Sequence, residues 1–370
     1  MTLKIRCLDA RSEQDVIRGV WRELVPGCGT AYLRHSVDWF FGHLDWISPP
    51  CRRLRFVLIQ DGPDPLALIP LESRAGTFGG IRFRYAGLID SPYAEPDTAL
   101  LLATNEARVG DAYAQLVFDN EPSWRFFSMN GLAVGSASES CLGRAFERQG
   151  IGVARSPDVV PYVLFQSGWT SYMATRSRNF RTSVSRATRR LEALGELEYE
   201  SVHGDGVGAL AVVEALDRAS WRMAKPRDVE KNATLIKYCQ RLFEVFPDPA
   251  HHVVRCLRLD GKPVASCYAF VYGGVTHAIK INYDMAYAEG SPGFYLLVRL
   301  FEELAAMGIE QIELMGQNQY LHRLGNASRE MTKALVFKRS GFGRLLGTTV
   351  RAAATVRRQS RSVTRASGRD

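Results

Sequence analysis

The loop Ser291-Pro292-Gly293 has the composition of an anion-binding site. It follows a strand-like stretch and leads into an amphipathic stretch over residues 293–307, which predicts a helix. The first N–H groups of a helix have no partner within the helix, and the helix dipole is positive there. The loop therefore favours a phosphate or pyrophosphate. Small residues also make ordinary turns, so the interpretation depends on the flanking strand and helix.

Four side chains near this loop have the chemistry to transfer protons. Asp284 and Glu313 end two predicted strands that should lie side by side, and Tyr320 and His322 follow in a polar loop. A carboxylate or an imidazole can act as a general base, and a phenol can act as a general acid. The alternative for each is a structural role: a strand-end carboxylate, a packed tyrosine or a surface histidine.

Residues 277–284 predict a strand with one polar face. Strict alternation places three polar side chains on one face and three apolar ones on the other (Lys280, Asn282 and Asp284; Ile279, Ile281 and Tyr283). The polar face predicts a wet cleft in which Lys280 meets a substrate. An ordinary solvent-exposed sheet face has the same pattern.

Residues 178–194 predict an amphipathic helix whose polar side is nearly all arginine, including Arg178 and Arg181. Arginine presents a fixed fork of donors to phosphates and carboxylates. The helix thus predicts an anion-facing surface, with a solvated basic face as the alternative. Trp221 and Arg222 end another helical stretch before Pro226, where they either face a substrate or serve as a structural cap.

The elements that must position these residues occur twice along the chain. Each copy has two helical stretches, a three-strand meander that turns at Asp-Gly, a helix and a strand, with the meanders near 54–87 and 253–284. Asp-Gly supplies the positive φ angles of tight hairpins. This repeat predicts an α/β fold with a mixed (α+β) sheet in each of two tandem domains, 1–160 and 161–347, around a central cleft. Asp97 of the first copy would oppose an anion, so the second copy is the predicted donor site.

Composition sets limits on this interpretation. The chain has 370 residues, 46% of them hydrophobic, and seven scattered cysteines without C-x-x-C spacing, so neither a disulfide scaffold nor a metal site is expected. The net charge of +8 falls to +3 without the last twenty residues, which hold six Arg and one Asp. Residues 348–370 are thus expected to be a basic, disordered tail. With no membrane span or signal peptide in the sequence, the expected location is the cytoplasm.

The sequence resembles the GNAT acyltransferase superfamily. Within it, the chain is similar to the cellulose-biosynthesis-type acetyltransferases, which are related to the Fem peptidyltransferases and have two GNAT modules in one chain. The resemblance lies in residues 178–181 and 189–195, the hairpin 259–265, Tyr283-Asp284 before 291–293, and Gly316 with Tyr320. It is good over about 165–345 and diffuse over 15–160. Leu321 departs from this branch, which usually has Lys after the Tyr.

The resemblance implies an N-acyltransferase that takes its acyl group from acyl-CoA or an acyl carrier protein and passes it to a small-molecule or peptide amine. The implied donor site comprises Tyr283, Ser291, Gly293, Phe294, Tyr295, Arg178 and Arg181. The acceptor side would comprise Trp221, Arg222 and Lys280, and the proton-transfer groups would be Asp284, Glu313, Tyr320 and His322. Two alternatives stay open: Fem-like aminoacyl transfer from charged tRNA, and a non-catalytic scaffold.

Overall fold

The structure, a computed structural model, describes residues 3–28, 33–78, 81–89, 101–102, 107–119, 124–149, 152–155, 158–220, 226–315 and 319–337. The chain forms two compact units. The N-terminal unit comprises Met1–Thr30, Leu44–Val159 and Glu330–Asp370, and the C-terminal unit comprises Ala31–His43 and Val160–Arg329. The predicted domains, 1–160 and 161–347, are each one stretch of chain. The N-terminal unit instead combines three separate segments of the chain, and the C-terminal unit combines two. The predicted tail, 348–370, lies outside the described residues.

The C-terminal unit is built around an antiparallel meander that a parallel strand extends. The two ladders of the meander pair β10 with β11 and β11 with β12, while β9 pairs with β10 on the outer side. On the inner side β13 runs parallel to β12, and β8 is antiparallel to β13. The strands are β8 (Asp158–Leu164), β9 (Leu197–Ser201), β10 (His252–Leu259), β11 (Lys262–Tyr272), β12 (Val275–Tyr283) and β13 (Gln311–Glu313).

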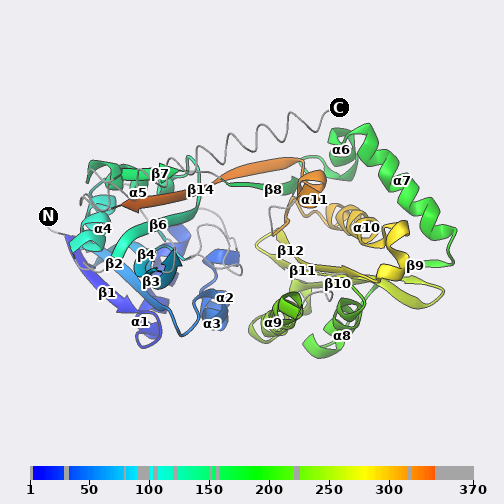
Figure 1. The fold of residues 1–370 in the computed structure, drawn as a ribbon, viewed down its shortest axis with the longest axis horizontal. Coiled ribbons are helices and arrows are strands. Elements are labelled where there is room, and N and C mark those ends of the chain that lie inside the picture. Colours follow the sequence, from blue (N-terminus) through cyan, green and yellow to red (C-terminus); the bar gives the residue numbers. More distant parts are fainter. Residues whose placement is uncertain are drawn as a thin grey trace. The chain divides into compact units, whose positions relative to one another are not determined.

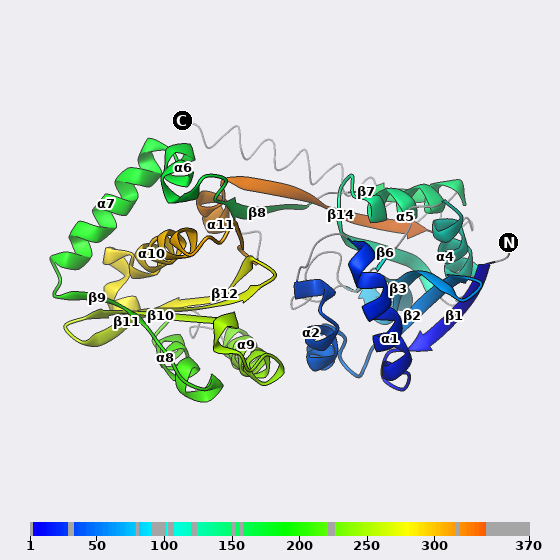
Figure 2. The same cartoon turned by 180° about the vertical axis from the view of Figure 1, so that it is seen from behind.

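Helices cover both faces of this meander (Figures 1 and 2). One face carries α8 (Gly206–Arg218) and α9 (Pro226–Val245), and the other carries α10 (Pro292–Ala306). Two further helices, α6 (Gly168–Thr175) and α7 (Arg178–Glu192), contact α10. The shorter elements of this unit are η2 (Leu33–His35), α2 (Val37–Gly42), η4 (Pro249–His251), η5 (Met285–Gly290) and α11 (Gln319–Leu324).

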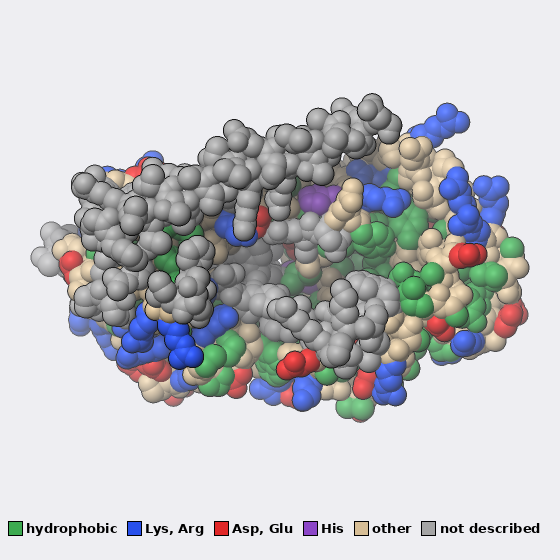
Figure 3. All heavy atoms as spheres, viewed as in Figure 1, with side chains coloured by type: hydrophobic (Ala, Val, Ile, Leu, Met, Phe, Trp, Pro, Cys, Tyr) green, Lys and Arg blue, Asp and Glu red, His purple; other side chains and the backbone are tan. Residues whose placement is uncertain are grey.

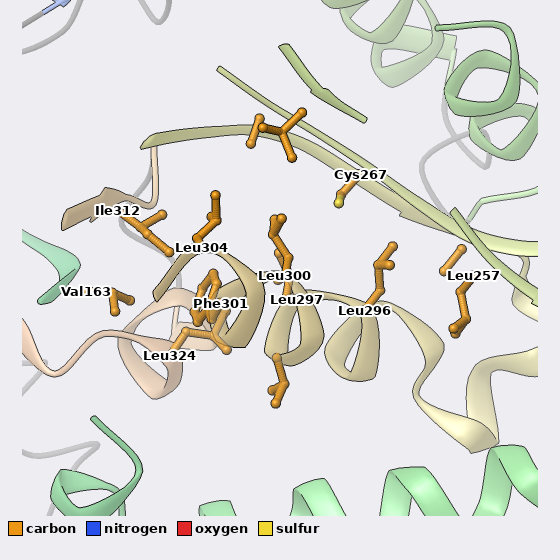
Figure 4. Close-up of a cluster of buried hydrophobic side chains, with 14 of the residues drawn as sticks. Val163, Leu257, Cys267, Leu296, Leu297, Leu300, Phe301, Leu304, Ile312 and Leu324 are labelled. Atoms are coloured by element: carbon orange, nitrogen blue, oxygen red, sulfur yellow. The ribbon is translucent and has the colours of Figure 1, made fainter. Parts of the chain in front are cut away.

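The core of this unit lies between α10 and the sheet. Leucines 296, 297, 300 and 304 of α10, together with Phe301, are buried against strand side chains that include Leu257 and Cys267 (Figure 4). Each such side chain contributes about 1.5–3 kcal/mol by leaving water. The buried stripe fixes the orientation of α10, and with it the position of the loop before the helix.

The N-terminal unit repeats this order of elements. Its meander pairs β2 with β3 and β3 with β4, and β6 runs parallel to β4. The strands are β1 (Leu3–Asp9), β2 (Arg53–Asp61), β3 (Asp64–Phe78), β4 (Ile81–Gly87), β5 (Leu101–Leu102), β6 (Trp124–Ala133) and β7 (Gly152–Arg155). The helices are α1 (Gln14–Leu24), η1 (Val25–Cys28), α3 (Leu44–Ile47), α4 (Ala107–Asp119) and α5 (Ala137–Arg148). The repeat predicted from the sequence is confirmed, as is the mixed α/β fold class.

The expectation of two separate sheets is wrong. One hydrogen-bonded path runs through the strands in the order β1-β2-β3-β4-β6-β14-β8-β13-β12-β11-β10-β9. The cause is that β8 and β14 (Ala327–Phe337) each continue from one unit into the other. Within the N-terminal unit, the end of β14 pairs with β6 and β7. A strand that continues a sheet leaves no open edge at that point.

Candidate functional site

The central feature of the C-terminal unit is that β12 and β13 are paired only over the first residues of β12 and then separate. Their parallel pairing covers residues 275–277 of β12 and residues 311–313 of β13, whereas β12 continues to Tyr283. The backbone groups of a strand point alternately to its two sides. Within the described part of the chain, residues 278–283 therefore have β11 on one side and no strand on the other. The strands β12 and β13 thus form a splayed pair.

A β-bulge lies at the start of the splayed half of β12. Tyr268 of β11 is opposite Lys280, and the next residue, Ala269, is opposite Ala278, so Ile279 is the extra residue. A bulge bends its strand and redirects the neighbouring backbone groups. The backbone N–H groups near Ile279 therefore leave the regular ladder beside the open edge.

The loop before α10 packs directly on the end of β12. A Cβ atom on Gly293 would lie 3.0 Å from Cδ1 of Tyr283, so glycine allows the helix to approach the strand this closely. Ser291 has left-handed backbone geometry (φ 56°), and its side chain does not cap the helix. The first N–H groups of α10 thus have no acceptor within the helix and no cap from Ser291, which suits an anion.

Half-buried aromatic side chains surround this junction. Tyr283, Phe294, Tyr295 and Tyr320 all pack against the core of the unit. Burial raises the pKa of the Tyr320 phenol well above its ordinary value; Arg323 lowers it and Tyr283 raises it by smaller amounts. Burial also raises the pKa of Tyr295. Tyr320 consequently keeps its proton at neutral pH, as a general acid must.

The two candidate carboxylates are not brought together. The register places Glu313 beside His277, at the beginning of β12, whereas Asp284 follows the end of that strand. Seven residues of strand separate the two positions by about 20 Å. The expectation that they converge is wrong because β13 is short and pairs only with the first residues of β12.

Each carboxylate also has partners of its own. The Asp284 Oδ1 atom accepts a hydrogen bond from the Ala286 N–H at 2.9 Å, and Lys262 Nζ lies 3.5 Å from Oδ2. Glu313 Oε1 is 2.5 Å from Arg329 Nη2 and 2.6 Å from Gln311 Nε2. Asp284 shares its end of β12 with the Ser291 loop. His322 is exposed in the last turn of α11.

Lys280 does not line an open cleft. Its side chain is 0% exposed, and its Nζ atom lies 3.0 Å from Oδ2 of Asp217 on α8, which is 7% exposed. Asn282, on the same face of β12, donates from Nδ2 to the Val213 carbonyl of α8 at 3.1 Å. The polar face is thus covered by α8 because α8 supplies the counter-charge. Asp217 was missed from the sequence, where it is one acidic residue in an ordinary amphipathic stretch.

The arginines of α7 lie on an exposed helix face that leads toward the loop. Arg178 and Arg181 are exposed, and the Arg181 guanidinium hydrogen-bonds to the Met173 and Arg176 carbonyls. Near the other end of α7, Arg190 Nη1 donates to the Glu289 carbonyl at 2.9 Å, just before the Ser291 loop. Figure 3 shows Lys and Arg side chains gathered over this part of the surface. Trp221, Arg222 and Gly316 lie outside the described residues.

No metal centre is present in the part of the chain that the structure describes: no three His, Cys, Asp or Glu side chains are grouped there to hold an ion. None of the described helices is both long and apolar enough to cross a membrane.

Comparison with known proteins agrees with this geometry. Residues 178–323 match the acetyltransferase (GNAT) domain family. This stretch holds β12, the loop, α10, β13 and Tyr320. The chain therefore contains a GNAT acetyltransferase domain, whose fold is that of an acyltransferase. The search of curated proteins gave no match by sequence.

One solved structure extends the likeness, in fold alone, to nearly the whole chain. FemX matches over 94% of this chain and 100% of its own, with a TM-score of 0.53 and 7% identity, which shows the fold. A tandem GNAT protein from the clavulanic acid biosynthesis pathway matches over 92% of this chain and 100% of its own, with a TM-score of 0.49 and 11% identity. The C-terminal domain (DUF2156) of a putative lysylphosphatidylglycerol synthetase from Agrobacterium fabrum covers 90% of this chain and 96% of its own, with a TM-score of 0.46 and 12% identity.

Proposed function

We propose that the C-terminal unit is an N-acyltransferase that moves an acyl group from an acyl thioester to an amine. The observation that carries this proposal is the open edge of β12 beside the loop before α10. A thioester lying along the open edge meets backbone N–H groups of β12 that have no strand opposite them in the described residues, and its diphosphate reaches the helix N-terminus at Ser291 and Gly293. The aromatic rings of Phe294 and Tyr295 would flank the donor there.

The reaction then needs two proton transfers and one backbone site. The amine nitrogen attacks the thioester carbonyl carbon, and backbone N–H groups beside the bulge at Ile279 hold the oxyanion. The C–S bond breaks as Tyr320 donates its proton to the leaving thiolate. Asp284 or Glu313 accepts the ammonium proton through water: Glu313 lies beside His277, two residues from the bulge, whereas Asp284 shares its end of β12 with the loop. Tyr320 regains its proton from solvent.

The donor is an acyl-CoA or the acylated phosphopantetheine arm of a carrier protein. Both carry the thioester at one end of a pantetheine arm and phosphate at the other end, and the arginine face of α7 offers charge to the phosphate of either. The acceptor is a small-molecule or peptide amine, with Trp221 and Arg222 as candidates for its recognition.

The test is isothermal titration of CoA and acetyl-CoA into the wild type and Gly293→Glu, followed by assay of thiol release with a panel of amines. Wild-type binding, a Kd at least tenfold weaker in the variant, and amine-dependent release would support the proposal. A glutamate at this position crowds Tyr283 and places a negative charge at the phosphate site. Gly19→Glu, at an open position on α1, is the matched control. Equal affinities in the wild type and Gly293→Glu would remove the loop from the donor site.

The row of exposed arginines on α7 favours a second candidate, aminoacyl transfer from a charged tRNA. Arginine can pair with a nucleic-acid backbone, and such binding weakens steeply as salt rises. Binding of tRNA with that salt dependence, together with indifference to CoA, would replace the first proposal with this one. Failure to bind either donor would leave a non-catalytic scaffold.

A further inference from the structure

The splayed half of β12 depends on α8 for its position. After His277 the strand has β11 as its neighbour on one side only, within the described residues. On the face toward α8, two side chains hold it: Lys280 by its ion pair with Asp217, and Asn282 by its hydrogen bond to the Val213 carbonyl. Val213 and Asp217 are one helical turn apart, so α8 holds two alternate residues of the strand at once.

The ion pair is a costly way to join a helix to a strand. Both side chains are almost fully removed from water, at 0% and 7% exposed. Taking two charges out of water costs so much that well-packed apolar residues often give equal or greater stability. An ion pair differs from apolar contact in that it fixes one atom of the strand against one atom of the helix.

The position of Lys280 on β12 indicates which part of the strand the ion pair holds. Lys280 directly follows the bulge residue Ile279, at the point where the register between β11 and β12 shifts. The Cys239 thiol also interacts electrostatically with Lys280, but burial raises its pKa to about 12 and keeps it neutral. Tyr268, opposite Lys280, is likewise kept protonated because burial raises its pKa.

We propose that Lys280 and Asp217 are a positioning pair, which holds the bulge so that its backbone N–H groups point at the thioester carbonyl. Neither side chain touches the substrate. The inference rests on the proposed acyl transfer and replaces the prediction that Lys280 binds the acceptor. Because an oxyanion exists only during the reaction, the pair should influence kcat much more than donor affinity.

The test is the double variant Asp217→Leu/Lys280→Met, which removes both charges and replaces the two side chains with apolar ones of similar volume. A single substitution would leave one buried charge without its partner and is expected to unfold more easily. The control is Glu200→Leu/Arg258→Met, which removes a cross-strand ion pair of 2.8 Å between β9 and β10, away from β12. Each protein is measured for its urea midpoint, its Kd for CoA and its kcat for acetyl-CoA thiol release.

The positioning role predicts that the double variant keeps its urea midpoint and binds CoA within about twofold of wild type. Its kcat should fall at least tenfold, because small displacements of reacting groups cost roughly 10²-fold. The amide signals of Ala278, Ile279 and Lys280 in NMR spectra should shift, whereas those of the control should not. A wild-type kcat in the double variant, or unshifted bulge signals, would overturn the inference. Failure of the proposed acyl transfer would be seen differently, as an absence of thiol release by the wild type. In that case the NMR comparison still tests whether the ion pair positions the bulge.

Discussion

The two units have the same order of elements, but in the described residues their pairs of parallel strands end differently. In the N-terminal unit, β4 stays paired with β6 through Gly87, and the Leu88 N–H continues the contact to the Ser128 carbonyl at 3.0 Å. In the C-terminal unit, β12 and β13 separate after His277 and Glu313. The fold repeat therefore does not by itself make the proposed donor site. That proposed site requires the two parallel strands to separate before the end of β12.

A glycine allows a close approach in each unit, but to a different element. A Cβ atom on Gly87 would lie 2.6 Å from the Ser128 carbonyl oxygen, so glycine there lets the strands close. Gly293 instead lets α10 approach Tyr283 while β13 stays away. The same residue type thus lets two strands stay paired in one unit and lets a helix approach the end of a strand in the other.

Among the substitutions that distinguish the two units, replacement of Tyr320 should have the largest effect on activity. Tyr320→Phe removes the proposed acid and should lower kcat by about 10²–10⁴ while leaving the Kd for CoA nearly unchanged. Tyr85→Phe, on β4 of the N-terminal unit, is the control and should leave both values unchanged. Steady-state kinetics and calorimetry measure the two effects. Near-full activity of Tyr320→Phe would mean that catalysis comes mainly from positioning.

Acid should weaken the C-terminal unit through His43, which packs there although it lies early in the chain. Burial lowers the pKa of His43 to about 4 from an ordinary 6.5. The unfolded chain therefore binds the proton first as pH falls, so the contribution of His43 to stability is complete above pH 6.5 and is lost between pH 6.5 and 4. The loss approaches about 3 kcal/mol.

Urea unfolding of wild type and His43→Gln at several pH values checks this expectation. The difference between their free energies of unfolding should shrink as pH falls from 7.5 to 4. Burial lowers the pKa of His252 in the same unit as well, and that effect is common to both proteins. A difference that does not change with pH would exclude His43 as the source.

The sequence predicted the parts of the site that depend on local pattern. The Asp-Gly turns, the amphipathic α7 and the small loop before α10 follow from residues close together in the chain, and the structure has all three. The meander and the parallel strand after it were also predictable, since each copy repeats them. Local rules suffice wherever neighbours in sequence determine the geometry.

The remaining features of the site depend on which strands pair and in what register. Residues close together in the sequence determine neither. Glu313 and Asp284 each end a strand, but the length of β13 decides that it pairs beside His277. Lys280 looked like a cleft residue because its partner, Asp217, lies 63 positions earlier in the sequence, on helix α8. The single sheet arises from β8 and β14, which leave one unit for the other. Long-range pairings of this kind require the folded structure.

Adding a methyl group at Gly87 can test whether the paired strands β4 and β6 of the N-terminal unit have only a structural role. Gly87→Ala would push a Cβ atom against the Ser128 carbonyl, and such overpacking typically costs about 1–3 kcal/mol of stability. Urea unfolding should show this loss, while kcat and donor Kd stay at wild-type values. Gly19→Ala, in an open position on α1, is the control and should stabilise slightly. A changed donor affinity in Gly87→Ala would mean that the two units are coupled in donor binding.

The smallest expected effect concerns the arginine face of α7 in the C-terminal unit. Arg178 and Arg181 are exposed, so their charges act on a donor through water and are screened by salt. Arg178→Glu/Arg181→Glu should therefore weaken CoA binding only about two- to tenfold at low salt, and the difference from wild type should vanish near 1 M salt, where the Debye length is about 3 Å. Arg144→Glu on α5, another exposed helical arginine that bonds to a backbone carbonyl of its own helix, is the control in the N-terminal unit. Calorimetry over a range of salt concentrations separates the outcomes. A loss that persists at high salt would indicate direct contact with the donor phosphates, and an unchanged Kd at low salt would show that this face does not serve CoA.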